Sequence, residues 1–138
     1  MAAKDFYHKH VRTALTKDGW TITDDPYVVE SLGTKLKVDL GAERLIAAEK
    51  GAEKIAVEVK SFIGPSRIDD LEDALGQFVL YRFSLKRAAP ERLLFLAIHE
   101  DVYEGIFMQP EGEALLREER LRLIVFSIDR EEIVKWIS

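Results

Sequence analysis

Val57-Glu58-Val59-Lys60-Ser61 closes an apolar run that begins at residue 54. Alternate residues of this run are β-branched, and a period of two indicates a β-strand over residues 54–60. Glu58 and Lys60 therefore share the strand face opposite to the β-branched residues. The pleat repeat places these two charged side chains about 7 Å apart along the strand. A carboxylate and an ammonium group thus mark the end of one strand.

A second strand is predicted upstream, around Lys37-Val38-Asp39-Leu40. Apolar and polar residues alternate there, with Leu36, Val38 and Leu40 on one side and Asp39 on the other. We expect a long strand over residues 35–49, with or without a bulge, which forms a hairpin with residues 54–60 through a turn at residues 50–53. Helix propensity is also high over residues 41–50, so a short helix between the two strands is the alternative.

The remaining pattern predicts an α/β fold with a central mixed β-sheet flanked by helices. Two antiparallel strands are followed by a helix that Ser66 caps, and this helix crosses over to a strand expected to run parallel. The full length is typical of a single domain, residues 1–138. The other expected elements are helices at 4–17, 66–87, 102–108 and 111–120, and strands at 20–23, 92–98, 121–128 and 133–137.

Composition narrows the class of protein. The chain is 47% hydrophobic and 33% charged, which is typical of a globular protein, and it contains no cysteine. No apolar run is long enough to span a bilayer, and the first residues lack the apolar stretch of a signal peptide. We therefore expect a cytoplasmic protein without membrane segments. A net charge of −5 argues against nucleic-acid binding through bulk charge, but leaves room for a local basic strip.

The strand-end residues Asp39, Glu58 and Lys60 have the chemistry of a metal-dependent phosphodiesterase. Two carboxylates hold a divalent cation, Mg²⁺ or Mn²⁺, and the carbonyl oxygen of Val59 offers a third ligand. The metal lowers the pKa of a bound water and stabilises charge on the attacked phosphate. Lys60 would orient or deprotonate that water, or neutralise the phosphate. These three side chains are the predicted catalytic residues.

Further residues are expected around this centre. Gln77 would position Lys60 or the DNA backbone, and Tyr81, one turn further along the same helix, would contact phosphate. Ser61, directly after the triplet, is expected to support the site or contact DNA. Asp5 or His8 of the first helix would complete the site. The simpler interpretation is a solvated strand face, on which each cross-strand ion pair contributes only about 0.2–1 kcal/mol.

These residues resemble a known nuclease motif. Asp39 with Glu58-Val-Lys60 is similar to the PD-(D/E)XK signature, and Gln77-Phe-Val-Leu-Tyr81 is similar to the Gln-x-x-x-Tyr element of some branches of that superfamily. The order helix, three strands, helix, strand over residues 4–98 also resembles its core. The resemblance implies a restriction-endonuclease-like fold and a metal-dependent DNA endonuclease.

A second resemblance spans the chain and points to the XisH family, the fdxN element excision controlling factors. It implies a factor required for programmed DNA excision by a separate site-specific recombinase, with a companion protein of the XisI type. The segments that carry it are Ala3-Lys-Asp-Phe-Tyr-His, Lys17-Asp-Gly-Trp-Thr-Ile-Thr, Asp39-Leu-Gly-Ala-Glu-Arg-Leu-Ile-Ala-Ala-Glu-Lys, Lys54-Ile-Ala-Val-Glu-Val-Lys-Ser-Phe and Ala74-Leu-Gly-Gln-Phe.

Two main functions remain open at this stage. The first is an enzyme that cuts or nicks DNA during excision. The second is a catalytically inactive regulator that keeps the nuclease scaffold and binds the companion factor or the recombinase. A protein-interaction module unrelated to DNA is a third. The strand predicted near the C-terminus, residues 132–137, also offers an edge for a homodimer.

Overall fold

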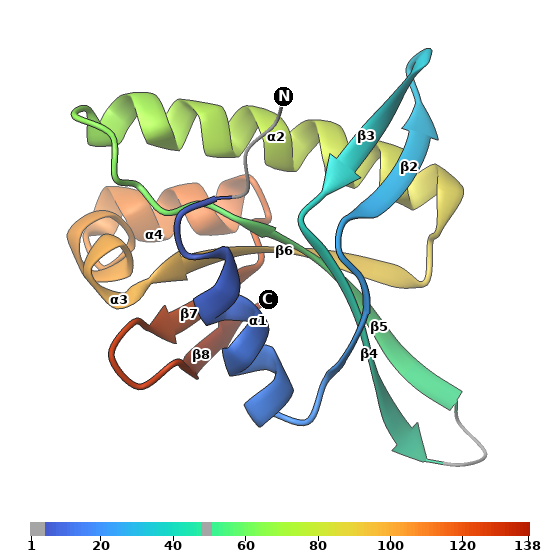
Figure 1. Cartoon of the computed structure of the whole chain (residues 1–138). Coiled ribbons are helices and arrows are strands. Elements are labelled where there is room, and N and C mark those ends of the chain that lie inside the picture. The colour runs from blue at the N-terminus through green and yellow to red at the C-terminus, as the bar shows by residue number, and fades with distance from the viewer. Residues whose placement is uncertain (1–4, 48–50) are drawn as a thin grey trace.

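The computed structural model describes residues 5–47 and 51–138. The chain forms a mixed six-stranded sheet and a separate two-stranded hairpin, with helices on both faces of the sheet (Figure 1). The elements are, in order, α1 (His8–Lys17), β1 (Thr21–Asp24), β2 (Tyr27–Ser31), β3 (Thr34–Val38), β4 (Leu40–Ala47), β5 (Gly51–Val59), α2 (Arg67–Ala88), β6 (Arg92–His99), α3 (Glu100–Val102), the π-helical segment η1 (Tyr103–Phe107), α4 (Pro110–Glu118), β7 (Leu123–Ser127) and β8 (Glu132–Ile137).

The six-stranded sheet has the order β1-β4-β5-β6-β7-β8. β4 and β5 pair antiparallel as predicted, but β5 begins at Gly51, so the turn predicted over residues 50–53 is wrong for residues 51–53. β5, β6 and β7 run parallel. Helix α2 makes the crossover from β5 to β6, as expected, and the Ser66 side chain caps it by accepting the Asp69 N–H at 3.2 Å. β8 lies at one edge of the sheet, as the sequence predicts. The α/β fold with a helix-flanked mixed sheet is therefore confirmed.

The alternation in β5 divides the core into two layers. Ala56 faces the α2 side of the sheet, where Phe78 and Leu96 pack, and Val57 faces the α1 side with Leu15. Helices η1 and α4 join α2 on its face, and α1 covers part of the other (Figure 1). Because β5 is buried on both faces, Glu58 is buried along with its neighbours Val57 and Val59. This placement determines the electrostatics of the site below.

The long strand predicted over residues 35–49 is wrong. The chain turns at Asp39, so that β3 pairs with β2 in a separate hairpin while β4 joins the main sheet. Val38 consequently packs on the α2 side and Leu40 on the α1 side, not on one common face. The alternative helix is also wrong over residues 41–47, which are strand, and residues 48–50 lie outside the described part.

Strand β2 was missed by the sequence interpretation. Its turn to β3 places both Leu32 and Gly33 at positive φ, 54° and 74°, which is the backbone of a tight hairpin turn. The hairpin stands beside α2 (Figure 1), where Ser31 Oγ accepts a hydrogen bond from Ser84 Oγ at 2.8 Å. It thereby holds the start of β4, and with it Asp39, against the helix-covered face.

Smaller differences concern element ends. The first helix begins at His8, so Asp5 precedes it, and Lys60 is the first residue after β5. The helix expected at 102–108 instead begins at Glu100 and continues as the π-helical η1. Within the described part of the chain, no helix combines the length and apolarity needed to cross a bilayer.

Candidate functional site

Asp39 and Glu58 meet where β4 begins and β5 ends. The Asp39 N–H donates to Glu58 Oε1 at 3.2 Å, and the Val59 N–H donates to Asp39 Oδ2 at 2.8 Å. The two carboxyl groups are therefore held against each other by main-chain donors of the opposite strand. This reciprocal contact also explains the turn at Asp39, because its side chain replaces a ladder bond that a continuous strand would make.

Burial and mutual repulsion dominate the electrostatics of this pair. Only 7% of Glu58 is exposed, and burial raises its pKa to about 9, with the Asp39 charge as the next cause. Burial likewise raises the pKa of Asp39, although its hydrogen bond from Val59 opposes the change. The Glu58 carboxyl therefore keeps a proton at neutral pH, which it shares with the neighbouring Asp39 carboxylate.

Asp5 connects the segment before α1 to the end of β5. Its Oδ2 accepts the Ser61 N–H at 3.1 Å, and the buried Ser61 Oγ accepts the Tyr7 N–H at 2.9 Å. Burial raises the pKa of Asp5, and the charge of Asp5 in turn raises the pKa of both Asp39 and Glu58. Asp5 thus belongs to the same acidic group, while Ser61 fixes the backbone around it.

His8 is buried but does not hydrogen-bond the acidic pair. Its Nε2 lies 2.9 Å from Asp25 Oδ1, and Arg12 Nη1 donates to Asp25 Oδ2 at 2.6 Å. Positive charge on His8 lowers the pKa of Asp39 and of Asp5, so the imidazole lies near enough to act on both through space. Sequence reasoning missed Asp25, because Asp24-Asp25-Pro26 has the pattern of an ordinary turn.

Lys60 lies beside the acidic group and points to α2. Its Nζ is 3.9 Å from Asp73 Oδ2, and its main-chain N–H donates to the Ala97 carbonyl at 3.0 Å. Because the Asp73 side chain is 69% exposed and the contact is long, this ion pair is a weak one. The charge of Lys60 lowers the pKa of Asp5, which places it within electrostatic range of the site.

The two α2 residues of the predicted site differ in their placement. Tyr81 is half-buried, and burial followed by the charges of Glu58 and Asp39 raises the pKa of its phenol to about 12. Tyr81 therefore lies within electrostatic range of the acidic pair. Gln77 is also half-buried, but in the described part of the chain its side chain makes no hydrogen bond, to Lys60 or to any other group.

A divalent cation suits the Asp39–Glu58 pair, although the protein supplies few ligands. Within residues 5–47 and 51–138, no three His, Cys, Asp or Glu side chains are arranged around a common metal position. Two carboxylates and the Val59 carbonyl would have to be completed by water or phosphate oxygens, a mixture that Mg²⁺ tolerates well. Burial is the main cause of the raised pKa values of both carboxyl groups, and a bound cation would favour their ionised forms.

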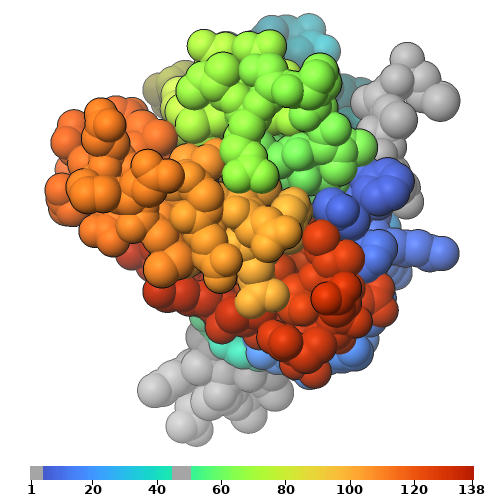
Figure 2. Space-filling model, turned by 90° about the vertical axis from the view of Figure 1, so that its left-hand side faces the viewer, coloured from blue at the N-terminus to red at the C-terminus, as the bar shows by residue number. Residues whose placement is uncertain are grey.

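The segments around this site gather at one end of the molecule. β5 and β6 both end there, and the same end carries the first turn of α2, α3 and the β7–β8 turn (Figure 2). His99 closes β6 at this end, with its ring 5.5 Å from that of Tyr7. Burial lowers the pKa of His99, so its imidazole is neutral at physiological pH. Carboxyl ends of parallel strands commonly carry ligand sites.

Two solved structures are similar to this chain over almost its whole length. A crystal structure of an XisH family protein from Nostoc punctiforme PCC 73102 is 40% identical, covers 97% of this chain and 100% of its own, and superimposes with a TM-score of 0.87. An fdxN element excision controlling factor protein from Anabaena variabilis is 40% identical, with coverage of 96% and 98% and a TM-score of 0.86. No protein of curated function matches the chain.

The family model described as XisH protein matches residues 1–134, nearly the whole chain. Its extent, together with the 40% identity of both solved structures, supports one family assignment for nearly the whole chain. The chain belongs to the XisH family.

Proposed function

We propose that this protein is a controlling factor for programmed DNA element excision, and that it carries a PD-(D/E)XK nuclease-like site that cuts or nicks DNA. The observation that carries the proposal is the reciprocal main-chain bonding of Asp39 and Glu58, at 3.2 Å and 2.8 Å. It brings two carboxylates together at adjacent strand ends, which is the arrangement that a hydrolytic metal centre requires. The name of the Anabaena variabilis relative supports the role in excision.

Each residue has a defined task in this proposal. Asp39, Glu58 and the Val59 carbonyl would hold Mg²⁺ or Mn²⁺, which supplies Lewis-acid activation of water and phosphate. Lys60 lies at the rim and would neutralise the attacked phosphate or orient the attacking water. Its weak pairing with exposed Asp73 lets it exchange that partner for a phosphate. Tyr81 would donate its phenolic proton, which its raised pKa retains, to a phosphate oxygen.

Nicking of supercoiled plasmid tests the catalytic part. We expect wild-type protein to relax the plasmid only with Mg²⁺ or Mn²⁺, and Asp39→Asn to lower the rate by about 100-fold or more, as removal of one electrostatic catalytic group does. Asparagine still accepts the Val59 N–H, so the fold should persist. Asp129→Asn, at an exposed turn, is the matched control for loss of one charge. If the wild-type protein nicks no DNA with either metal, the proposed endonuclease activity is wrong.

A catalytically inactive regulator is the second candidate. It is favoured because, among the described residues, no third acidic or imidazole side chain shares a metal position with the pair, although Asp5 and His8 lie near it. The oxygens of Asp39 and Glu58 also already accept main-chain N–H groups. In this case the protein would bind a companion factor of the XisI type, the recombinase or DNA. The exposed edge of β8 would form the interface of a homodimer.

Stabilisation by divalent cations separates the two candidates without an activity assay. If Asp39 and Glu58 bind Mg²⁺, the cation displaces the proton of Glu58, so the rise in melting temperature at a fixed Mg²⁺ concentration should grow from pH 6 to pH 9. Asp39→Asn should abolish the rise, and Asp129→Asn should keep it. An inactive regulator predicts no pH-dependent rise in the wild-type protein, and that result would refute the metal site.

A further inference from the structure

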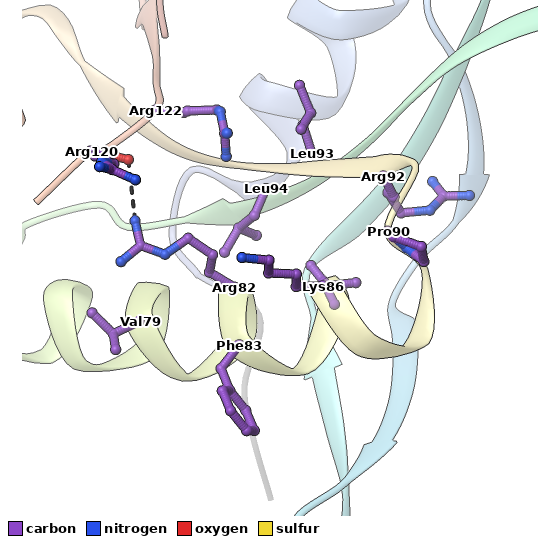
Figure 3. Close-up of a pocket in the computed structure, with 11 residues that line it drawn as sticks. Val79, Arg82, Phe83, Lys86, Pro90, Arg92, Leu93, Leu94, Arg120 and Arg122 are labelled. Atoms are coloured by element: carbon purple, nitrogen blue, oxygen red, sulfur yellow. Dashed lines mark hydrogen bonds between the residues drawn. The ribbon is translucent and has the colours of Figure 1, made fainter.

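A cavity lies at the start of β6, away from the Asp39–Glu58 pair. It has a volume of about 560 Å³ and is bounded by α2, the start of β6 and the segment that leads into β7 (Figure 3). Arg92, Leu93 and Leu94 at the start of β6 line the cavity, whereas Glu58 pairs with Leu96 farther along the strand, and neither Asp39 nor Glu58 lines it. The cavity is therefore not part of the Asp39–Glu58 site.

Four cationic side chains from outside β6 line this cavity. Arg82 and Lys86 reach it from α2, and Arg120 and Arg122 reach it from the segment between α4 and β7 (Figure 3). We name these four residues the basic pocket. Its floor is apolar, formed by residues such as buried Leu94. Figure 3 shows Lys86 lying in the space between helix and strand, with Arg82 rising toward Arg120.

Within residues 5–47 and 51–138, no acidic side chain pairs with the basic pocket. No aspartate or glutamate lines the cavity, and among the residues that the structure describes none of the four cations forms an ion pair. Arg92 also borders the space, but its guanidinium turns away to the Ile55 carbonyl at 2.8 Å and to Glu43 at 3.6 Å (Figure 3). In a chain of net charge −5, this concentration of unpaired positive charge is unusual.

The pocket is also held in place by the fold. Arg82 Nη1 donates to the carbonyls of Glu119 and Arg120, at 2.9 Å and 3.2 Å, and its guanidinium lies 5.1 Å from the Phe78 ring. Arg120 has a φ of 52°, a left-handed conformation that ends α4 and fixes the direction of the chain toward Arg122. These contacts position Arg82 while its remaining N–H groups have no partner in the described part of the chain.

We propose that the basic pocket binds phosphate groups. A single carboxylate neutralises one cation, whereas a phosphate monoester carries about −1.5 to −2 charges at neutral pH and offers three acceptor oxygens. Arginine forks match phosphate oxygens in pairs, and a lysine adds a mobile point charge. Three arginines and one lysine around an apolar-floored cavity of about 560 Å³ therefore suit a phosphate carried on a nucleotide-sized group or on a nucleic-acid backbone.

The test compares two double variants that each lose two positive charges. Lys86→Gln with Arg122→Gln removes half of the basic pocket while leaving the structural bonds of Arg82. Lys35→Gln with Lys37→Gln, both exposed on β3, is the matched control. Binding of sodium pyrophosphate and of a 12-base-pair DNA duplex is measured by calorimetry in EDTA, so that the result does not depend on a cation at Asp39 and Glu58.

We expect the pocket variant to bind pyrophosphate at least tenfold more weakly than wild type, and the control variant to stay within twofold. If the natural source is a nucleic-acid backbone, the wild type binds the duplex as well, and the pocket variant reduces the salt dependence of log K by about two. If the source is a free phosphorylated compound, only pyrophosphate responds. The proposal is overturned if wild type binds neither probe, or if both variants lose affinity equally while their melting temperatures stay unchanged.

Discussion

We expect Glu58→Gln to raise the free energy of unfolding by about 3 kcal/mol at pH 7 and the melting temperature by about 10 °C. In the folded protein the pKa of Glu58 is about 9, against an ordinary value of 4.5. Between pH 4.5 and about 9, each pH unit therefore lowers the free energy of unfolding by about 1.4 kcal/mol, because the folded state keeps a proton that the unfolded state has released. Glutamine needs no proton, accepts the Asp39 N–H with its carbonyl, and donates to the Asp39 carboxylate with its amide.

The direction of the pH dependence follows from the same shift. An acid with a raised folded pKa binds more protons in the folded state than in the unfolded state between pH 4.5 and 9, so wild-type stability falls as pH rises through that window. Glu58→Gln should flatten this slope. Urea unfolding at pH 5, 7 and 9 measures both effects.

The control for this prediction is Glu53→Gln, which lies on the same strand with a side chain 46% exposed. Its ion pair with Arg44 is a surface pair, so the change should stay within about 1 kcal/mol and should not alter the pH slope. A Glu58→Gln protein no more stable at pH 7 than Glu53→Gln, or a wild type equally stable at pH 5 and pH 9, would show that Glu58 is ionised in the fold.

Gly112→Ala is expected to destabilise the protein by about 3 kcal/mol or more, at the upper end of the range for overpacking. Gly112 is buried in α4, and a β-carbon there would overlap the main-chain carbonyl of Ile106 in η1. Main chain cannot rotate away as a side chain can, so α4 and η1 would have to separate. Chemical denaturation compares the variant with wild type at one pH.

Gly76→Ala makes the same chemical change but is expected to raise the stability of the protein. Gly76 is exposed in the interior of α2, and a β-carbon there would meet no atom within 4 Å. Alanine should stabilise this helix by about 0.5–1 kcal/mol, because glycine loses more backbone freedom on folding. If Gly112→Ala unfolds no more easily than wild type, the close packing of α4 on η1 described here is wrong.

Local patterns in the sequence were sufficient to predict strand β5 and helix α2. The alternation through Ile55, Val57 and Val59 identified β5 and its two faces, because each residue there packs according to strand geometry alone. Ser66 marked the start of α2 through its cap, and the length of that helix implied a parallel crossover to β6. These features depend on contacts close in sequence or on chain geometry, and both can be read without coordinates.

The turn at Asp39 could not be read in the same way. Alternation over residues 35–40 continues unbroken in the sequence, and the change of sheet depends on a hydrogen bond from Val59, twenty residues away. The pairing of His8 with Asp25 is likewise a contact between separate elements. The basic pocket collects side chains from α2 and from the segment before β7, so no single stretch of sequence indicates it.

The parallel pairing of β5 with β6 has a consequence for biosynthesis. Lys54 pairs with Arg92, 38 residues later in the chain. At translation rates of about 5–20 residues per second, the nascent polypeptide spends about 2–8 s with one side of β5 lacking its neighbour. An unpaired strand edge can pair with strands of other chains. We therefore expect co-translational chaperones to be most important for this protein during this interval.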